Sequence, residues 1–182
     1  KAIKNEILNS IAFTYLLEDQ NILDNHKFIS RYLQLTTDTS ENNEIRKIDT
    51  AIKNLKTGNR LPLSKLEDIN SKPFNINTDI TGQTVIFFWT SCARAHLTMI
   101  YDKIEALKKE YPTTRFIAIN VDDNKEWKKT VDVYKTDNVK QLRVLNFKDI
   151  KDKWVVTKIN RTIILNPDGT VKNAFTNLMD PK

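Results

Sequence analysis

The first 58 residues carry apolar side chains at the spacing of a helix. Ile3, Ile7 and Ile11 recur every fourth residue, and a later segment repeats the pattern with Ile45, Ile48, Ile52 and Leu55. Positions three or four apart lie on one face of an α-helix. We therefore predict a helical subdomain or linker over residues 1–58 and a second domain over residues 59–182.

The second domain begins with short segments that predict strands. Residues 61–76 contain two of them, separated by the polar turn Asn70-Ser71-Lys72, and this pattern predicts a hairpin. Residues 84–89 and 115–122 are apolar runs, and the stretch between them has helical spacing through Leu97, Ile100, Ile104 and Leu107. A strand, a helix and a strand in this order predict a right-handed βαβ unit with parallel strands.

Two further elements follow this unit. Residues 124–134 are predicted to form a helix with Trp127, Val131 and Tyr134 on one face. Residues 162–171 predict a strand, the turn Pro167-Asp168-Gly169 and a returning edge strand. Strands alternating with helices indicate the α/β class.

Composition excludes several classes of function. Apolar residues make up 40% and charged residues 29% of the 182 residues, as in an ordinary globular protein. No apolar run approaches the roughly 18 residues of a membrane span. The net charge of +6 comes from Lys interleaved with Asp and Glu, without a basic cluster among aromatic residues, so we expect no nucleic-acid partner. Because no basic and apolar leader opens the sequence, we expect any targeting segment to lie outside it.

The segment from Val85 to His96 is the most informative for function. It reads Val-Ile-Phe-Phe-Trp-Thr-Ser-Cys-Ala-Arg-Ala-His, a strand that ends in Trp89 and leads into a helix. It resembles the active-site segment of the TlpA/ResA-like envelope thioredoxins, in which Phe-Trp is followed by two small residues, an aromatic residue and Cys-x-x-Cys. Residues 61–89, 115–123 and 160–171 also resemble the leading hairpin, the second parallel strand and the closing hairpin of that family.

The resemblance implies a thioredoxin-like fold, a central mixed sheet flanked by helices, behind the N-terminal helical subdomain. It also implies a place in the cell envelope or periplasm and a relationship to thiol-disulfide oxidoreductases. The helical region with its exit Leu-Lys-Thr-Gly-Asn-Arg-Leu-Pro is similar to the linker of multi-domain Bacteroidetes members, so this chain is expected to be the C-terminal part of a longer protein.

The redox residues of the family are replaced in this chain. Counted without gaps from Trp89, the two cysteine positions fall on Ala93 and His96, and the single cysteine, Cys92, takes the aromatic position. The family's cis-proline position falls on Asn160, where we expect a trans peptide, because a cis bond before a residue other than proline costs about 2.5–4 kcal/mol. Dithiol exchange needs a nucleophilic and a resolving thiol, and one cysteine cannot supply both.

These replacements favour a redox-inactive module that binds a protein or peptide. Its expected contact surface is the former substrate groove, formed by Trp89, Ala93, Arg94, His96 and Asn160. In this register Cys92 should be partly shielded.

A second register remains open. If the loop after Trp89 is one residue shorter, Cys92 takes the first cysteine position and Arg94 lies near it. The chain would then be a monothiol oxidoreductase or redox sensor that forms a mixed disulfide with a partner or glutathione. The helical position of Ile100 favours the register with Ala93. The Pro-x-x-x-Thr-x-x-Cys pattern of peroxiredoxins is absent.

The remaining candidate residues are expected to have structural roles. His96 and His26 occur without the spacing of a metal site, and we expect no metal or cofactor. Asp122 and Asp123 follow a strand and are expected to cap the next helix. The three tryptophans are expected in the core or at its rim: Trp89, Trp127 and Trp154.

Overall fold

The computed structural model describes residues 2–19, 25–123, 126–134 and 137–179. The chain forms two compact units, Lys1–Asn54 and Leu55–Lys182. None of the described helices is both long and apolar enough to cross a membrane.

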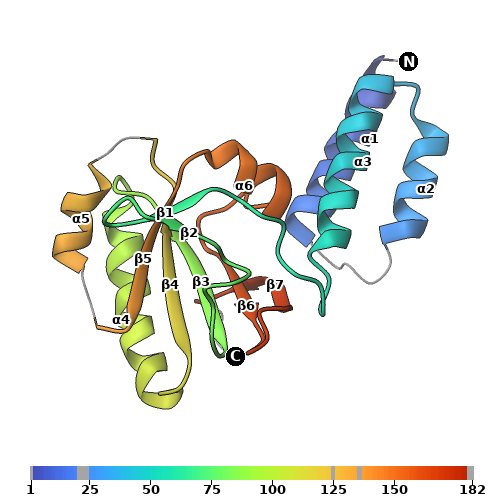
Figure 1. Ribbon diagram of the computed structural model, residues 1–182. Coiled ribbons are helices and arrows are strands. Elements are labelled where there is room, and N and C mark those ends of the chain that lie inside the picture. The colour runs from blue at the N-terminus through green and yellow to red at the C-terminus, as the bar shows by residue number, and fades with distance from the viewer. Residues whose placement is uncertain (1, 20–24, 124–125, 135–136, 180–182) are drawn as a thin grey trace. The chain divides into compact units, whose positions relative to one another are not determined.

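The first unit is helical, so the predicted N-terminal helical region is confirmed (Figure 1). It contains α1 (Ala2–Thr14), the π-helical turn η1 (Tyr15–Asp19), α2 (Asn25–Leu35) and α3 (Thr39–Asn54). Tyr15 stacks on Phe28 with ring centroids 4.0 Å apart. The Tyr32 hydroxyl donates a hydrogen bond of 2.7 Å to Asn9 Oδ1, which joins α2 to α1.

The second unit contains a seven-stranded mixed sheet with the order β2-β1-β5-β4-β3-β6-β7. Its strands are β1 (Leu66–Asp68), β2 (Pro73–Phe74), β3 (Thr84–Trp89), β4 (Arg115–Asn120), β5 (Val139–Val144), β6 (Arg161–Leu165) and β7 (Val171–Asn177). Strands β3, β4 and β5 are parallel, and β6 and β7 extend the sheet in antiparallel fashion. The predicted βαβ unit and both hairpins are therefore present, although the first hairpin is shorter than residues 61–76.

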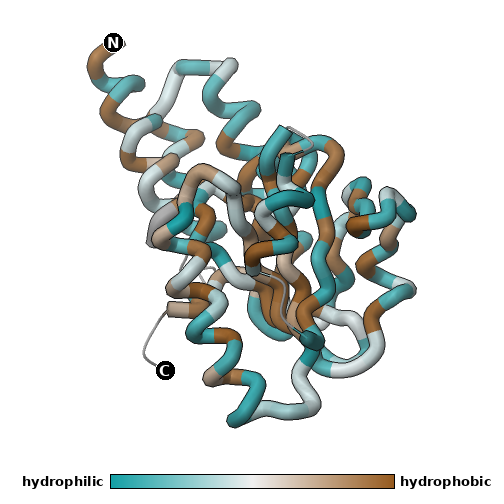
Figure 2. Tube along the Cα trace, turned by 90° about the vertical axis from the view of Figure 1, so that its left-hand side faces the viewer, coloured by the Kyte–Doolittle hydropathy of each residue, from teal (hydrophilic) through white to brown (hydrophobic). Residues whose placement is uncertain are grey.

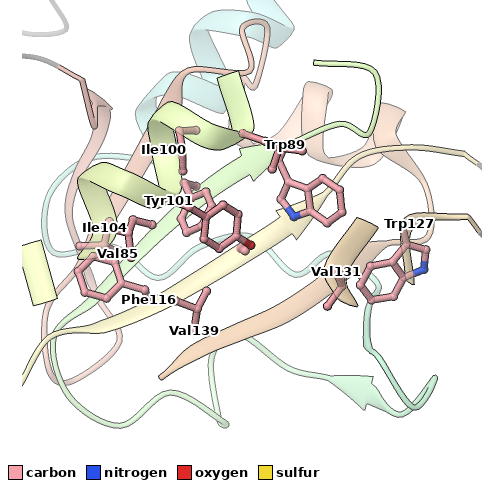
Figure 3. Packing of buried hydrophobic residues seen from close by; sticks show 12 residues of the cluster. Val85, Trp89, Ile100, Tyr101, Ile104, Phe116, Trp127, Val131 and Val139 are labelled. Carbon is pink, nitrogen blue, oxygen red and sulfur yellow. The ribbon is translucent and has the colours of Figure 1, made fainter. Parts of the chain in front are cut away.

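Helices cover both faces of this sheet. They are α4 (Arg94–Glu110), α5 (Trp127–Tyr134) and α6 (Phe147–Trp154). Val85, Phe87 and Trp89 of β3 belong to the core cluster that α4 and α5 build on one face (Figure 3). Phe88 points to the other face, where its ring lies 6.4 Å from that of Trp154 in α6.

Burial on both faces explains the uninterrupted apolar sequence of β3, since every residue of this strand is buried. The hydrophobic colour gathers along the neighbouring strands inside the unit (Figure 2). All three tryptophans lie in the core, with exposed fractions of 1% or less, as expected.

Candidate functional site

The segment that joins β3 to α4 is a short loop, residues 90–93, hereafter the β3–α4 loop. Ala93 is the N-cap residue of α4, and its methyl side chain makes no capping hydrogen bond. The first backbone N–H groups of a helix have no partner within the helix, and an alanine N-cap supplies none from its side chain. Among the described residues, the N-terminal end of α4 therefore keeps unpaired backbone donors beside the loop.

Asp122 holds the β3–α4 loop from the neighbouring strand. Its carboxylate accepts hydrogen bonds from the Thr90 hydroxyl, from the Ser91 backbone N–H at 2.8 Å and from Asn120 Nδ2 at 2.9 Å. Capping of the next helix by Asp122 and Asp123 stays a prediction, because residues 124–125, which precede α5, lie outside the described residues. The ladder pairs Trp89 with Asn120, so residues that follow the two parallel strands lie side by side.

The environment of Asp122 changes its acidity. Desolvation raises the pKa of this carboxyl, but the hydrogen bonds from Asn120, Thr90 and Ser91 together lower it more. The net pKa lies below its ordinary value of 3.8, so the group is a carboxylate at neutral pH.

Cys92 is exposed, which corrects the expectation that it would be partly shielded. Its Sγ lies 3.3 Å from Thr90 Oγ1. A threonine hydroxyl has one hydrogen, and the Asp122 carboxylate accepts that hydrogen. The Cys92 S–H is therefore the donor toward Thr90 Oγ1, and the three side chains form a directed chain from sulfur to carboxylate.

The other predicted groove residues on this segment occupy different environments. Arg94 is exposed at the first position of α4, and His96 is half-buried two residues later. The His96 Nε2 and Trp89 Nε1 atoms are buried without a hydrogen-bond partner among the described residues. His26 lies in α2 of the first unit, and the described His, Cys, Asp and Glu side chains form no group of three that could hold a metal ion.

Asn160 directly precedes β6 and lies at the same end of the sheet as Trp89. The β3–β6 ladder ends at the pair Phe87 and Thr162, so Trp89 and Asn160 each lie two residues beyond it. Asn160 is half-buried. No described peptide bond is cis, so the bond before Asn160 is trans, as expected.

Sequence reasoning missed the polar side chains that fix the loop, which are Thr90, Ser91 and Thr130. Thr130 of α5 donates a hydrogen bond of 3.2 Å to Ser91 Oγ. The available signal was the parallel alignment of the two strands, because it brings residues 90–91 next to residue 122.

Comparisons with known proteins agree with this architecture. A family model described as Thioredoxin-like matches residues 83–171. A candidate thiol-disulfide oxidoreductase from Bacteroides vulgatus has a similar structure, with a TM-score of 0.59 and 20% identity over 70% of this chain and 92% of that one. A domain of a candidate thiol-disulfide isomerase from Cytophaga hutchinsonii gives a TM-score of 0.56 and 19% identity over 68% and 86% of the two chains.

The C-terminal domain of a candidate thiol-disulfide oxidoreductase from Bacteroides thetaiotaomicron is also similar. Its TM-score is 0.54, with 18% identity over 65% of this chain and 86% of that one. Among curated proteins, none matches the sequence significantly. At these identities the structural matches establish the fold, which is thioredoxin-like α/β.

Proposed function

We propose that this chain carries a thioredoxin-like domain of the TlpA/ResA type that does not exchange dithiols and binds a protein or peptide. The observation that carries the proposal is Ala93 at the N-cap of α4. A helix N-terminus lowers the pKa of a cysteine placed there, and the resolving thiol follows on the same helix. Here the cap is a methyl side chain and His96 lies three residues later.

The proposed contact surface is the β3–α4 loop with Arg94, His96 and Asn160. Free backbone donors at the α4 N-terminus suit the carbonyl groups of an extended peptide, and Arg94 is exposed beside them. The resemblance to envelope thioredoxins supports a place in the cell envelope or periplasm.

The exposure of Cys92 favours a second candidate function, monothiol exchange. In that reaction the Cys92 thiolate attacks one sulfur of a disulfide such as oxidised glutathione. A mixed disulfide forms and the other sulfur leaves as a thiolate. Cys92 is oxidised as the attacked disulfide is reduced, so the reaction needs no further oxidant.

Insulin reduction with dithiothreitol tests the dithiol part of the proposal. We expect the unaltered protein to give no turnover above dithiothreitol alone. As a matched control, Cys92→Ser with Ala93→Cys and His96→Cys rebuilds Cys-x-x-Cys in the first register, and Ala95→Cys rebuilds it with Cys92 in the second. The variant that gains activity identifies the register, whereas turnover by the unaltered protein would refute the proposal.

Mass spectrometry after incubation with oxidised glutathione separates the two candidates. A rapid and saturating adduct that disappears in Cys92→Ser would favour monothiol exchange. A slow adduct, together with weaker peptide binding in Arg94→Ala or Asn160→Ala but not in Cys92→Ser, would favour the binding module.

A further inference from the structure

A cavity of about 730 Å³ lies at the amino ends of β3, β4 and β5. We call it the amino-end cavity, and its lining includes Asp79, Thr84, Thr114, Arg115 and Lys140. It is at the opposite end of the sheet from the β3–α4 loop, which follows the carboxyl end of β3 (Figure 1). The described residues that line it all belong to the second unit. Its volume is that of a small-molecule site, which ordinarily has about 300–1,000 Å³.

The strand register brings two cationic side chains to one face of the sheet in this cavity. Thr84 pairs with Arg115 in the β3–β4 ladder, and Ile117 pairs with Lys140 in the β4–β5 ladder. Residues two apart on a strand share a face, so the Arg115, Ile117 and Lys140 side chains leave the sheet on the same side. Lys140 is partly engaged, because its Nζ lies 3.4 Å from Asp68 Oδ2.

Arg115 presents a guanidinium group that can bind an anion. The residue is exposed, and its side chain forms no hydrogen bond or ion pair with the rest of the described chain. Its backbone N–H donates a hydrogen bond of 2.9 Å to the Gln83 carbonyl. A Cβ atom built on Gly82 would lie 3.7 Å from Arg115 Nε, so the side chain lies against the Gly82 backbone. The planar guanidinium group matches a carboxylate through two parallel hydrogen bonds.

The remaining charge in the described lining is the Asp79 carboxylate. It accepts hydrogen bonds of 2.8 Å from the Asn75 backbone N–H and of 2.8 Å from the Thr78 hydroxyl. These hydrogen bonds lower the pKa of Asp79, so the group is ionised at neutral pH. With Arg115 and Lys140 against this one carboxylate, the described lining has an excess of one positive charge. Such a site complements a monoanion better than a dianion.

Neutral side chains complete the lining and suit a hydroxylated ligand. The Thr113 and Thr114 hydroxyls and the Asn138 amide line the cavity without a hydrogen-bond partner in the part of the chain that the structure describes. Hydroxyl and amide groups can both donate to and accept from ligand hydroxyls. Phe74 and Ile80 also line the cavity and are only partly buried, so they offer apolar surface to the C–H groups of a ring.

We infer that the amino-end cavity binds a sugar acid, a small hydroxylated ring that carries one carboxylate. Arg115 pairs with the carboxylate, and Thr113, Thr114 and Asn138 exchange hydrogen bonds with the ring hydroxyls. The cavity and the β3–α4 loop lie at opposite ends of the sheet. The inference therefore extends beyond the proposed function and can fail without it.

Isothermal titration calorimetry of the full chain with glucuronate at pH 7.5 tests the inference. Glucose has a similar ring without the carboxylate, and acetate has the carboxylate without the ring. We expect saturable binding of glucuronate with a Kd below about 10 mM, at least about tenfold tighter than that of glucose or acetate. Glucose 6-phosphate carries a dianion and should bind more weakly than glucuronate. Tighter binding of glucose 6-phosphate would identify a phosphate site and overturn the inference.

Three variants locate the binding. Arg115→Gln should weaken glucuronate binding at least about tenfold without lowering the thermal unfolding midpoint, because the side chain is exposed. Arg115→Lys keeps the charge but loses the paired geometry, so its affinity should lie between the two. Arg46→Gln removes the same charge from an exposed position on α3 and should leave the affinity unchanged. Absence of saturable binding, or equal affinities of Arg115→Gln and Arg46→Gln, would overturn the inference and leave peptide binding at the β3–α4 loop untouched.

Discussion

The Asp122 carboxylate, just beyond β4, accepts a hydrogen bond from the hydroxyl of Thr90, just beyond β3. The same carboxylate also accepts the Ser91 N–H at 2.8 Å. Residues that follow two neighbouring parallel strands thus fix the loop that carries Cys92. Because the Thr90 hydrogen is donated to Asp122, the hydrogen bond between Cys92 and Thr90 runs from the sulfur to Thr90 Oγ1. Exposure of a thiol and its freedom to react are separate properties at this site.

Asp122→Asn should accelerate alkylation of Cys92 by iodoacetamide. The asparagine amide can donate to Thr90 Oγ1, which frees the Thr90 hydrogen to point at the sulfur and removes the acceptor of the S–H group. One neutral hydrogen bond is worth about 1 kcal/mol, so we expect a rate increase of roughly fivefold at pH 7. The unaltered protein should react no faster than cysteine in a model peptide, as measured by mass spectrometry over time.

Thr130→Val is the matched control for this prediction. It removes the hydrogen bond from α5 to Ser91 and loosens the loop without changing the partners of Thr90. Its alkylation rate should stay within about twofold of the unaltered protein. Equal acceleration in both variants would mean that loop mobility, not the direction of the hydrogen bond, controls Cys92.

The main elements around the site were predictable because their signals are local. The apolar run of β3 and the helical spacing of α4 follow from burial of a central strand and of one helix face. The contacts of Asp122 could not be predicted in the same way. A carboxylate after a strand can cap a helix or hold a neighbouring loop, and only the register between strands decides between them.

The strand and helix between residues 135 and 160 could not be predicted, because their sequence shows no clear hydrophobic period. Strand β5 carries Lys140, Gln141 and Arg143, which break its apolar run. Gln141 is nevertheless buried, because its amide donates a hydrogen bond of 2.8 Å to the Tyr101 hydroxyl. Helix α6 is only 8 residues long and buries two of them, Ile150 and Trp154. The segment is therefore too short for a helical period to be recognised in its sequence.

Acid should destabilise the protein partly through Asp122. Its pKa is lowered in the folded state, so its ionised form adds stability above the ordinary value of 3.8, and this is lost as pH falls through the lower folded value. The free energy of unfolding, measured by urea titration below pH 4, should decrease more steeply in the unaltered protein than in Asp122→Asn. Parallel curves would show that Asp122 does not contribute to this dependence.

Trp154 should be the main anchor of α6 on the sheet. It is fully buried, lies against Phe88, and donates a hydrogen bond of 2.7 Å from Nε1 to the Pro62 carbonyl. Trp154→Ala should lower the free energy of unfolding by about 3–5 kcal/mol. Trp154→Phe keeps most of the packing and should cost clearly less, and equal losses would mean that the hydrogen bond dominates.

Arg161 is a buried charge without a described carboxylate partner, and its replacement should be tolerated. It is 6% exposed, donates a hydrogen bond of 3.3 Å to the Ala174 carbonyl, and lies 4.6 Å from the ring centroid of Phe175. Desolvation lowers its pKa from the ordinary arginine value to about 10, so the folded state disfavours the charged form. This burial therefore reduces stability at neutral pH, and the penalty begins to fade only when pH rises above about 10.

Arg161→Met replaces the side chain by an apolar one of similar length. We expect its free energy of unfolding at pH 7 to equal that of the unaltered protein or to exceed it by about 1 kcal/mol. Arg161→Ala removes the same charge but leaves a cavity, so it should be less stable than Arg161→Met by about 2 kcal/mol. If both variants lose the same stability, the hydrogen bond to Ala174 and the contact with Phe175 outweigh the desolvation of the guanidinium group.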